Sequence, residues 1–191
     1  MLERLFGWSK ASKCKFLLEI LIKRLQVLQN KRKIQIKQLR NDIVELLKNG
    51  RHKSCLKRAK LLYKEQNLLD GYNLIVNFCV CIMEHISYVR RNNDLPPVLN
   101  EAVSSLIFAS ARCADLPELQ GLRDLFAQRY GVEFVSAALD GNSDSSVGQQ
   151  IIGKLSNKLA TLDLKLKLME EIAVEFSLPW DSSVTCADLG S

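Results

Sequence analysis

The stretch from Ser12 to Asn49 contains no glycine or proline and repeats its apolar residues at the period of an α-helix. The residues of this apolar stripe lie three or four positions apart, or sums of these: Leu17, Leu21, Leu25, Leu28, Ile36, Leu39, Ile43 and Leu46. Only Arg32 interrupts them. Because such spacing places side chains on one face, the pattern predicts a long amphipathic helix, with Ser12 as its cap and Gly50 as its terminator.

A second long helix is expected from about Lys53 to Val89. The connection around Gly50 spans only about four residues, so the two helices should pack as antiparallel neighbours. Gly71 lies inside the second helix and should weaken it by about 1 kcal/mol relative to alanine. The chain has only 9 glycines and 4 prolines, and no stretch is predicted to be a strand. The sequence therefore predicts an all-α protein, a long antiparallel helical hairpin with shorter helices packed on it.

The shorter helices should follow a break at Asn92–Pro97. They are expected at Val98–Arg112, from Asp115 as a cap through Pro117 to Gly131, and at Glu133–Leu139, Ile151–Leu155 and Thr161–Phe176. Residues 162–168 alternate like a strand, but the helical spacing continues over a longer span, and length favours a helix. We expect an N-terminal apolar and basic arm at residues 1–11, a helical domain at 12–181 and a tail at 182–191.

Positive charge gathers at the front of the chain. The first 64 residues hold 18 of the 27 Lys and Arg residues but only 4 of the 21 Asp and Glu residues. On the first helix, the cations projecting away from the apolar stripe are Lys15, Lys23, Lys33, Lys37, Arg40 and Lys48. A charged face often serves only to solvate a helix, but solubility does not require charge of a single sign. We expect this basic face to bind an anionic partner.

An anionic membrane surface fits the basic face better than nucleic acid does. Phe16 is the only aromatic residue in positions 9–62, and it is expected on the apolar side, so no base-stacking platform accompanies the lysines. A membrane needs only the basic helical face. The apolar residues ahead of the helix either insert as a membrane anchor or simply pack or fray: Leu2, Leu5, Phe6 and Trp8. We expect no nucleic-acid partner, although a basic helical nucleic-acid-binding protein is the alternative function.

No catalytic centre, cofactor or metal is expected. Cys81 and His85 lie one helical turn apart with Cys79 nearby, but a zinc site needs about four ligands, and His52 is the only other histidine. A Cys–His nucleophile would lack an orienting third group. The six cysteines follow no disulfide framework, and charged residues interrupt any secretory signal. The chain is therefore expected to be a cytoplasmic, non-enzymatic protein with free thiols.

One block of sequence resembles a known family. Residues 102–119 read Ala-Val-Ser-Ser-Leu-Ile-Phe-Ala-Ser-Ala-Arg-Cys-Ala-Asp-Leu-Pro-Glu-Leu. This block resembles the ESCRT-III-like family named for increased sodium tolerance, regulators of the endosomal AAA ATPase, and especially its plant members. Residues 126–134, 164–172 and 176–181 resemble it too, so the likeness covers roughly residues 10–181. Family members commonly continue into a polar tail that binds MIT domains, so this chain is expected to be a short member or a core domain.

The resemblance implies a non-enzymatic subunit of the multivesicular-body pathway. It implies binding to, and co-polymerisation with, ESCRT-III proteins of the charged-multivesicular-body class on endosomal membranes. It also implies regulation of the AAA ATPase that disassembles those polymers, either indirectly or through a tail. In ESCRT-III proteins a C-terminal helix resembles a latch. The corresponding apolar face here, expected to dock on the hairpin, comprises Leu162, Leu166, Met169, Ile172 and Phe176.

Overall fold

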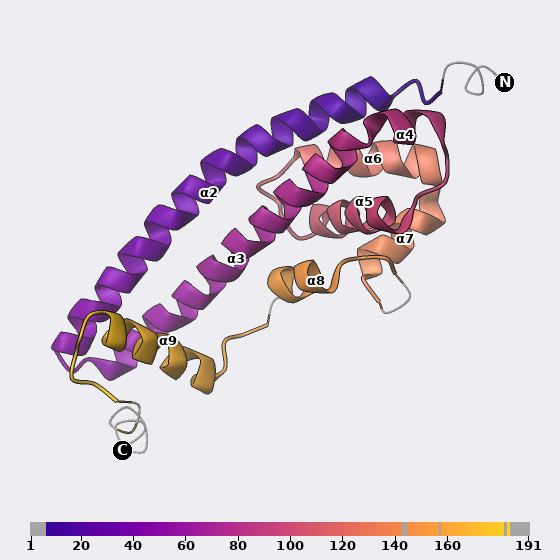
Figure 1. Cartoon of the computed structure of the whole chain (residues 1–191). Coiled ribbons are helices and arrows are strands. Elements are labelled where there is room, and N and C mark those ends of the chain that lie inside the picture. The colour runs from indigo at the N-terminus through magenta and orange to yellow at the C-terminus, as the bar shows by residue number, and fades with distance from the viewer. Residues whose placement is uncertain (1–6, 143–144, 157, 182, 184–191) are drawn as a thin grey trace. The chain divides into compact units, whose positions relative to one another are not determined.

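The computed structural model describes residues 7–142, 145–156, 158–181 and 183, and every regular element in these ranges is a helix (Figure 1). The helices are α2 (Ala11–Lys48), α3 (His52–Glu84), α4 (Ile86–Arg91), α5 (Pro97–Ser110), α6 (Glu118–Tyr130), α7 (Val132–Asp140), α8 (Gln149–Leu155) and α9 (Leu162–Glu175). The prediction of an all-α fold built on two long helices is confirmed.

The turn between α2 and α3 forms where the sequence placed it. Gly50 has a φ of +64°, the left-handed conformation that glycine adopts without strain. The Arg51 N–H donates to the Leu46 carbonyl at 2.9 Å, and the Gly50 N–H donates to the Leu47 carbonyl at 3.1 Å. These two bonds satisfy the last carbonyls of α2 as a Schellman motif. The chain therefore reverses at once, and α3 returns alongside α2 (Figure 1).

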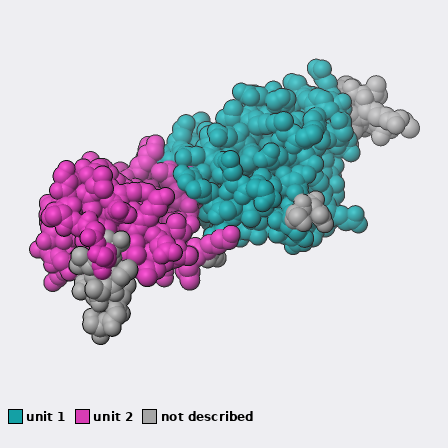
Figure 2. Space-filling model, turned by 60° about the horizontal axis from the view of Figure 1, so that its bottom comes forward, with its two compact units in different colours: residues 1–29, 70–156 teal, residues 30–69, 157–191 magenta. Residues whose placement is uncertain are grey.

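The chain forms two compact units (Figure 2). Unit 1 comprises residues 1–29 and 70–156, and unit 2 comprises residues 30–69 and 157–191. The helices α2 and α3 contribute a segment to each unit. Residues 12–181, expected to form one helical domain, contribute to both units. Trp8 and Ala11, assigned from sequence to a separate arm, are buried in the core of unit 1.

In unit 1, α5 is the central helix. Its residues 102–109 are all buried, and α6, α7 and α8 pack against it. The Gly148 N–H, just before α8, donates to Ser105 Oγ at 3.0 Å. A Cβ atom on Gly71 of α3 would lie 2.7 Å from Leu155 Cδ2 of α8. Gly71 therefore lets α8 pack closely against α3. The sequence alone predicts that glycine weakens the helix but does not predict this packing role.

Two polar contacts tie the long helices of unit 1 to the α5–α6 region. Arg24 Nε of α2 donates to both carboxylate oxygens of Glu118, at 2.8 and 2.9 Å, and Glu118 is only 8% exposed. The Tyr72 hydroxyl of α3 donates to the Asp115 carboxylate. Asp115 was expected to cap α6, but that helix begins at Glu118 with Pro117 at its N-cap position.

The second long helix is shorter than predicted. It ends at Glu84, and a separate short helix, α4, follows His85. His85 has φ −103° and ψ 15°, which interrupts the helical backbone, and its Nδ1 lies 2.8 Å from the Cys81 carbonyl oxygen. The expectation of one helix to Val89 was therefore wrong at its C-terminal end.

Arg32, the one interruption of the apolar stripe, has a clear role in unit 2. Its Nη1 lies 2.9 Å from Glu65 Oε2 of α3, and both side chains are less than one-fifth exposed. None of the eight residues of the apolar stripe is exposed. The apolar stripe therefore lies on the covered side of α2: Leu21, Leu25 and Ile43 are buried, the other five residues are partly buried, and an ion pair occupies its one charged position.

Candidate functional site

The predicted basic face of α2 is solvent-accessible over most of its length. Five of its six residues are exposed: Lys15, Lys23, Lys33, Lys37 and Lys48. Lys15 lies 3.9 Å from Glu19 and Lys48 lies 2.9 Å from Glu45, both as exposed pairs within the helix, which contribute little to stability. The remaining three lysines form no ion pair with any described residue, so they are the available cations of this face.

Arg40 does not belong with these available cations. Its guanidinium pairs with the Glu175 carboxylate of α9 inside unit 2, and Arg40 is only partly exposed. Arg40 therefore joins α2 to α9. Its helical position does put it on the basic face, as predicted, but its partner lies 135 positions away in the chain and could not be predicted from that position.

A second set of cations on α3 escaped the sequence analysis. These lysines are all exposed and follow a four-three-four spacing, which places them on one side of the helix: Lys53, Lys57, Lys60 and Lys64. None of them forms an ion pair among the residues that the structure describes. Their spacing is visible in the sequence. Unit 2 therefore exposes unpaired lysines on both of its long helices.

The final helix α9 packs on the long helices of unit 2. Met169, Ile172 and Ala173 are buried there. The residues that receive them come from both long helices: Ile43, Val44, Leu47, Cys55, Leu56, Ala59 and Leu62. The predicted α9 is thus confirmed, and Thr161 caps it by accepting the Leu164 N–H at 3.3 Å.

Two residues of the predicted docking face do not reach this core. Leu162 and Phe176 are each 42% exposed, whereas Leu166 is partly buried against the core. After α9 the backbone reverses at Ser177, whose φ is +52°, and the Leu178 N–H donates to the Ala173 carbonyl at 2.8 Å. This turn places Leu178 and Trp180 against the core instead of Phe176.

Of the alternatives left open for the apolar residues ahead of α2, membrane insertion or packing, Trp8 shows packing in this structure. Trp8 is only 3% exposed, and its backbone N–H donates to the Arg90 carbonyl oxygen at 2.7 Å. The other anchor residues, Leu2, Leu5 and Phe6, lie outside the described residues. Phe16, expected on the apolar side of α2, is 58% exposed. No described helix combines the length and the hydropathy that crossing a membrane requires.

The cysteines of the described ranges are free thiols. We call the most enclosed ones the buried thiols: Cys14, Cys55, Cys79 and Cys113. Burial raises the pKa of Cys14 and Cys113 to about 12 and that of Cys55 to about 11, and it raises the pKa of Cys79 as well. No cluster of three metal-binding side chains occurs within the described ranges. The absence of metal and of disulfides in the whole protein stays a prediction.

The family of the chain follows from residues 15–179, which match the model of the Ist1 family, described as regulator of Vps4 activity in the MVB pathway. The chain belongs to the Ist1 family. The match covers both units, so the two long helices and the helices packed on them are together the family's domain. The resemblance seen in the sequence is thereby confirmed at the level of the family.

Relatives of known name agree with this assignment. An IST1-like protein of Dictyostelium discoideum is 24% identical over 93% of this chain and 48% of its own length. The vacuolar protein sorting-associated protein IST1 of Saccharomyces cerevisiae is 25% identical over 88% of this chain and 58% of its own length. The chain therefore spans about half the length of these Ist1 relatives.

A solved structure has the same fold. The crystal structure of the N-terminal domain of S. cerevisiae Ist1, in complex with the MIM motif of Did2, matches with a TM-score of 0.79 at 24% identity. The match covers 91% of this chain and 96% of that domain. The predicted ESCRT-III-like helical fold is confirmed by this likeness.

Proposed function

We propose that this Ist1-family chain is a non-enzymatic regulator of a Vps4-type ATPase in the multivesicular-body pathway. It acts by binding ESCRT-III subunits of the charged-multivesicular-body class at the surface of endosomal membranes, where it joins their polymers. The observation that carries the proposal is the family match over residues 15–179, whose description names Vps4 regulation. The family is described by regulation and not by a reaction, which supports a binding role without catalysis. Membership of the plant-type branch is part of the same proposal.

The first partner in the proposal is a short helical MIM motif of an ESCRT-III subunit. The crystal structure of the N-terminal domain of yeast Ist1, which has the same fold, is a complex with the MIM motif of Did2. The test is a titration of the 191-residue chain into a fluorescent peptide that carries a MIM helix, read by anisotropy. We expect saturable binding that is lost when the apolar residues of the peptide are replaced by aspartate. No saturation up to about 1 mM would overturn the proposed partner.

The second element is the membrane-facing role of the basic face. Lys23, Lys33 and Lys37 are exposed and unpaired among the described residues, and the α3 lysines add further cations to unit 2. A lysine near an anionic leaflet contributes about 1 kcal/mol of attraction. Several such residues together suffice for peripheral binding without any inserted segment.

The membrane role is tested by sedimentation with phosphatidylserine liposomes. The Lys33→Glu, Lys37→Glu double variant loses about 2 kcal/mol of attraction, roughly 30-fold in affinity, before any repulsion is counted. Arg40 is left unchanged because it pairs with α9. The matched control is Lys165→Glu, Lys167→Glu, which makes the same charge change on α9. Equal weakening in both variants would overturn the α2 site, and stronger retention by RNA than by liposomes at equal salt would favour the nucleic-acid alternative.

The third element is a latch. The helix α9 covers apolar residues of α2 and α3 in unit 2, and it is tied there by the pair of Arg40 with Glu175. We place the closed monomer in this arrangement, with release of α9 favouring assembly. The hinge of this latch is proposed in the loop-like sequence Asp140–Ser146, which lies before α8.

A further inference from the structure

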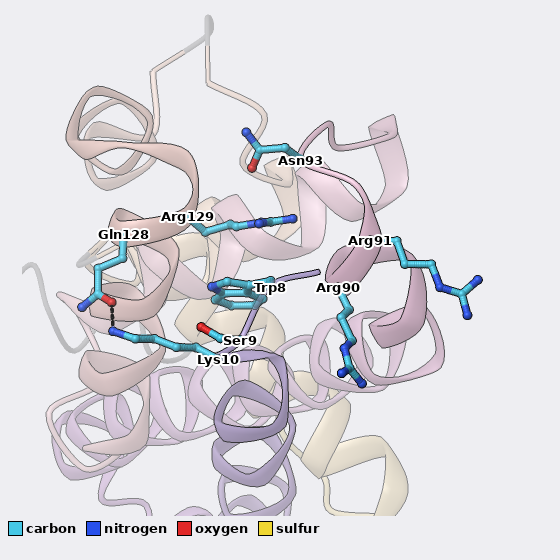
Figure 3. Close-up of a pocket in the computed structure, with 8 residues that line it drawn as sticks. All are labelled: Trp8, Ser9, Lys10, Arg90, Arg91, Asn93, Gln128 and Arg129. Carbon is cyan, nitrogen blue, oxygen red and sulfur yellow. Dashed lines mark hydrogen bonds between the residues drawn. The ribbon is translucent and has the colours of Figure 1, made fainter. Parts of the chain in front are cut away.

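A pocket of about 530 Å³ opens in unit 1, away from the lysines of the basic face (Figure 3). Three separate stretches line it: Trp8, Ser9 and Lys10 ahead of or at the start of α2, Arg90, Arg91 and Asn93 at the end of α4, and Gln128 and Arg129 of α6. The volume falls in the range of small-molecule sites. None of the residues assigned to membrane, partner or latch in the proposed function lines this pocket.

On the side of the pocket at Trp8, the backbone of Gly7 and Trp8 lies very close to the backbone of Arg90. Gly7 has a φ of +73°, and a Cβ atom at that position would meet the Arg90 carbonyl oxygen at 2.5 Å. Glycine at this position therefore lets the chain ahead of α2 lie against the end of α4, where the backbone N–H of Trp8 donates to the Arg90 carbonyl oxygen. The indole is held in place with 3% of its surface exposed.

Arg129 crosses the pocket and has no anionic partner among the residues that the structure describes. Figure 3 shows its side chain passing over Trp8 toward Asn93, and its guanidinium carbon lies 5.5 Å from the Trp8 ring centroid. Its Nη2 donates to the carbonyl oxygens of Val89 and Asn92 at 3.1 and 2.8 Å. Its Nε is buried and bonds to no described residue. Carbonyl dipoles therefore hold this cation, and no carboxylate of a described residue pairs with it.

The charge of the pocket is one-sided. Four of its eight lining residues are Lys or Arg, and none is Asp or Glu. Lys10 donates to the neutral amide of Gln128, while Arg90 and Arg91 form no ion pair with any described residue. Asp94, the acidic residue next to Asn93, accepts the Tyr88 hydroxyl at 2.6 Å and is not part of the lining.

We infer that this pocket binds a polyphosphorylated anion of the inositol-phosphate type. Arginine presents paired donors that match phosphate oxygens, and lysine adds a point charge. Cations on opposite sides of a pocket this wide suit a ligand with several phosphates better than a single one. In Figure 3 Arg90 and Arg91 extend outward from α4. Exposed side chains change rotamer freely, so both can turn onto a bound ligand. A free inositol polyphosphate and a lipid headgroup share this chemistry.

The test uses isothermal titration of the 191-residue chain with inositol hexakisphosphate. We expect one saturable site. The Arg90→Gln, Arg91→Gln double variant should weaken it by about tenfold or more, because two charge-assisted contacts are lost. The control variant Lys165→Gln, Lys167→Gln makes the same charge change on α9, outside both the pocket and the basic face, and should bind as the unmodified chain does. Equal weakening in both variants, or no saturable heat, would overturn the inference.

Further arms identify the ligand and its source. If inorganic phosphate displaced inositol hexakisphosphate at an equal concentration, the requirement for several phosphates on one ligand would be overturned. The Arg90→Gln, Arg91→Gln variant is also tested on phosphoinositide vesicles and on phosphatidylserine vesicles of equal charge. If the variant binds less well only to the phosphoinositide vesicles, the ligand is a lipid headgroup. Binding of the free hexakisphosphate alone identifies a soluble source. In a Trp180→Phe background Trp8 is the sole tryptophan, so its fluorescence should change on titration, and an unchanged spectrum at saturation would place the ligand elsewhere.

Discussion

Replacing Ile172 by alanine tests whether α9 is a separable latch or a fixed part of unit 2. Ile172 is fully buried, with Met169 and Ala173 beside it in the same core. Truncating a buried isoleucine to alanine costs about 2–5 kcal/mol. If α9 opens on its own, its open form becomes about 30-fold to several thousand-fold more populated, because each 1.4 kcal/mol is a factor of about ten.

Native-state hydrogen exchange read by mass spectrometry measures this opening. In the Ile172→Ala variant, peptides from α9 should exchange faster by that factor, while peptides from α5 and α6 keep their protection. The control is Val174→Ala on the same helix, since Val174 is 74% exposed and its truncation should change stability by less than about 0.5 kcal/mol. The latch is refuted if α9 exchange is unchanged. It is also refuted if α5 and α6 lose protection by the same factor, because α9 would then open only with the whole molecule.

Three further predictions concern packing and the thiols. Gly153→Ala, with nothing within 4 Å of its Cβ, should raise the melting temperature by stabilising the chain by about 1 kcal/mol, whereas Gly71→Ala should gain less, because its Cβ would lie 2.7 Å from Leu155 Cδ2 and that side chain would have to shift. At pH 8 iodoacetamide should label Cys81 well before the buried thiols, as peptide mass mapping would reveal, and equal rates would contradict their burial. Unfolded thiols ionise near pH 8.5, yet the buried thiols stay protonated in the fold, so the urea midpoint should fall as pH rises from about 8.5 toward 11–12. A midpoint constant over that range would contradict the raised pKa values.

The sequence predicted the long helices because their signals are local. The spacing of the apolar stripe on α2 needs no knowledge of the partner helix, and Gly50 supplies a conformation that few other residues adopt. These features depend on residues within one or two turns of each other, so a sequence displays them directly.

The remaining features depend on residues far apart in the chain. The break at His85 lies in an apolar run without glycine or proline, so no local signal marked it. Phe176 has the correct spacing for the α9 face, but the turn at Ser177 gives its place to Leu178 and Trp180. The polyanion pocket is lined by three segments that are far apart in the chain, so the sequence alone does not show that they meet. From the sequence, Trp8 could be described only as an apolar residue near the start of the chain.

The division of the chain into units also affects how the protein can be made. Each unit combines two separated stretches of sequence, so its early residues leave the ribosome long before their partners. Leu18 and Leu21 of α2, fully buried in unit 1, stay uncovered until residues 70–156 have been synthesised. Unit 2 is completed last, when α9 emerges. A nascent chain halted after α3 therefore has neither core complete, and no single cut in the sequence yields either unit intact.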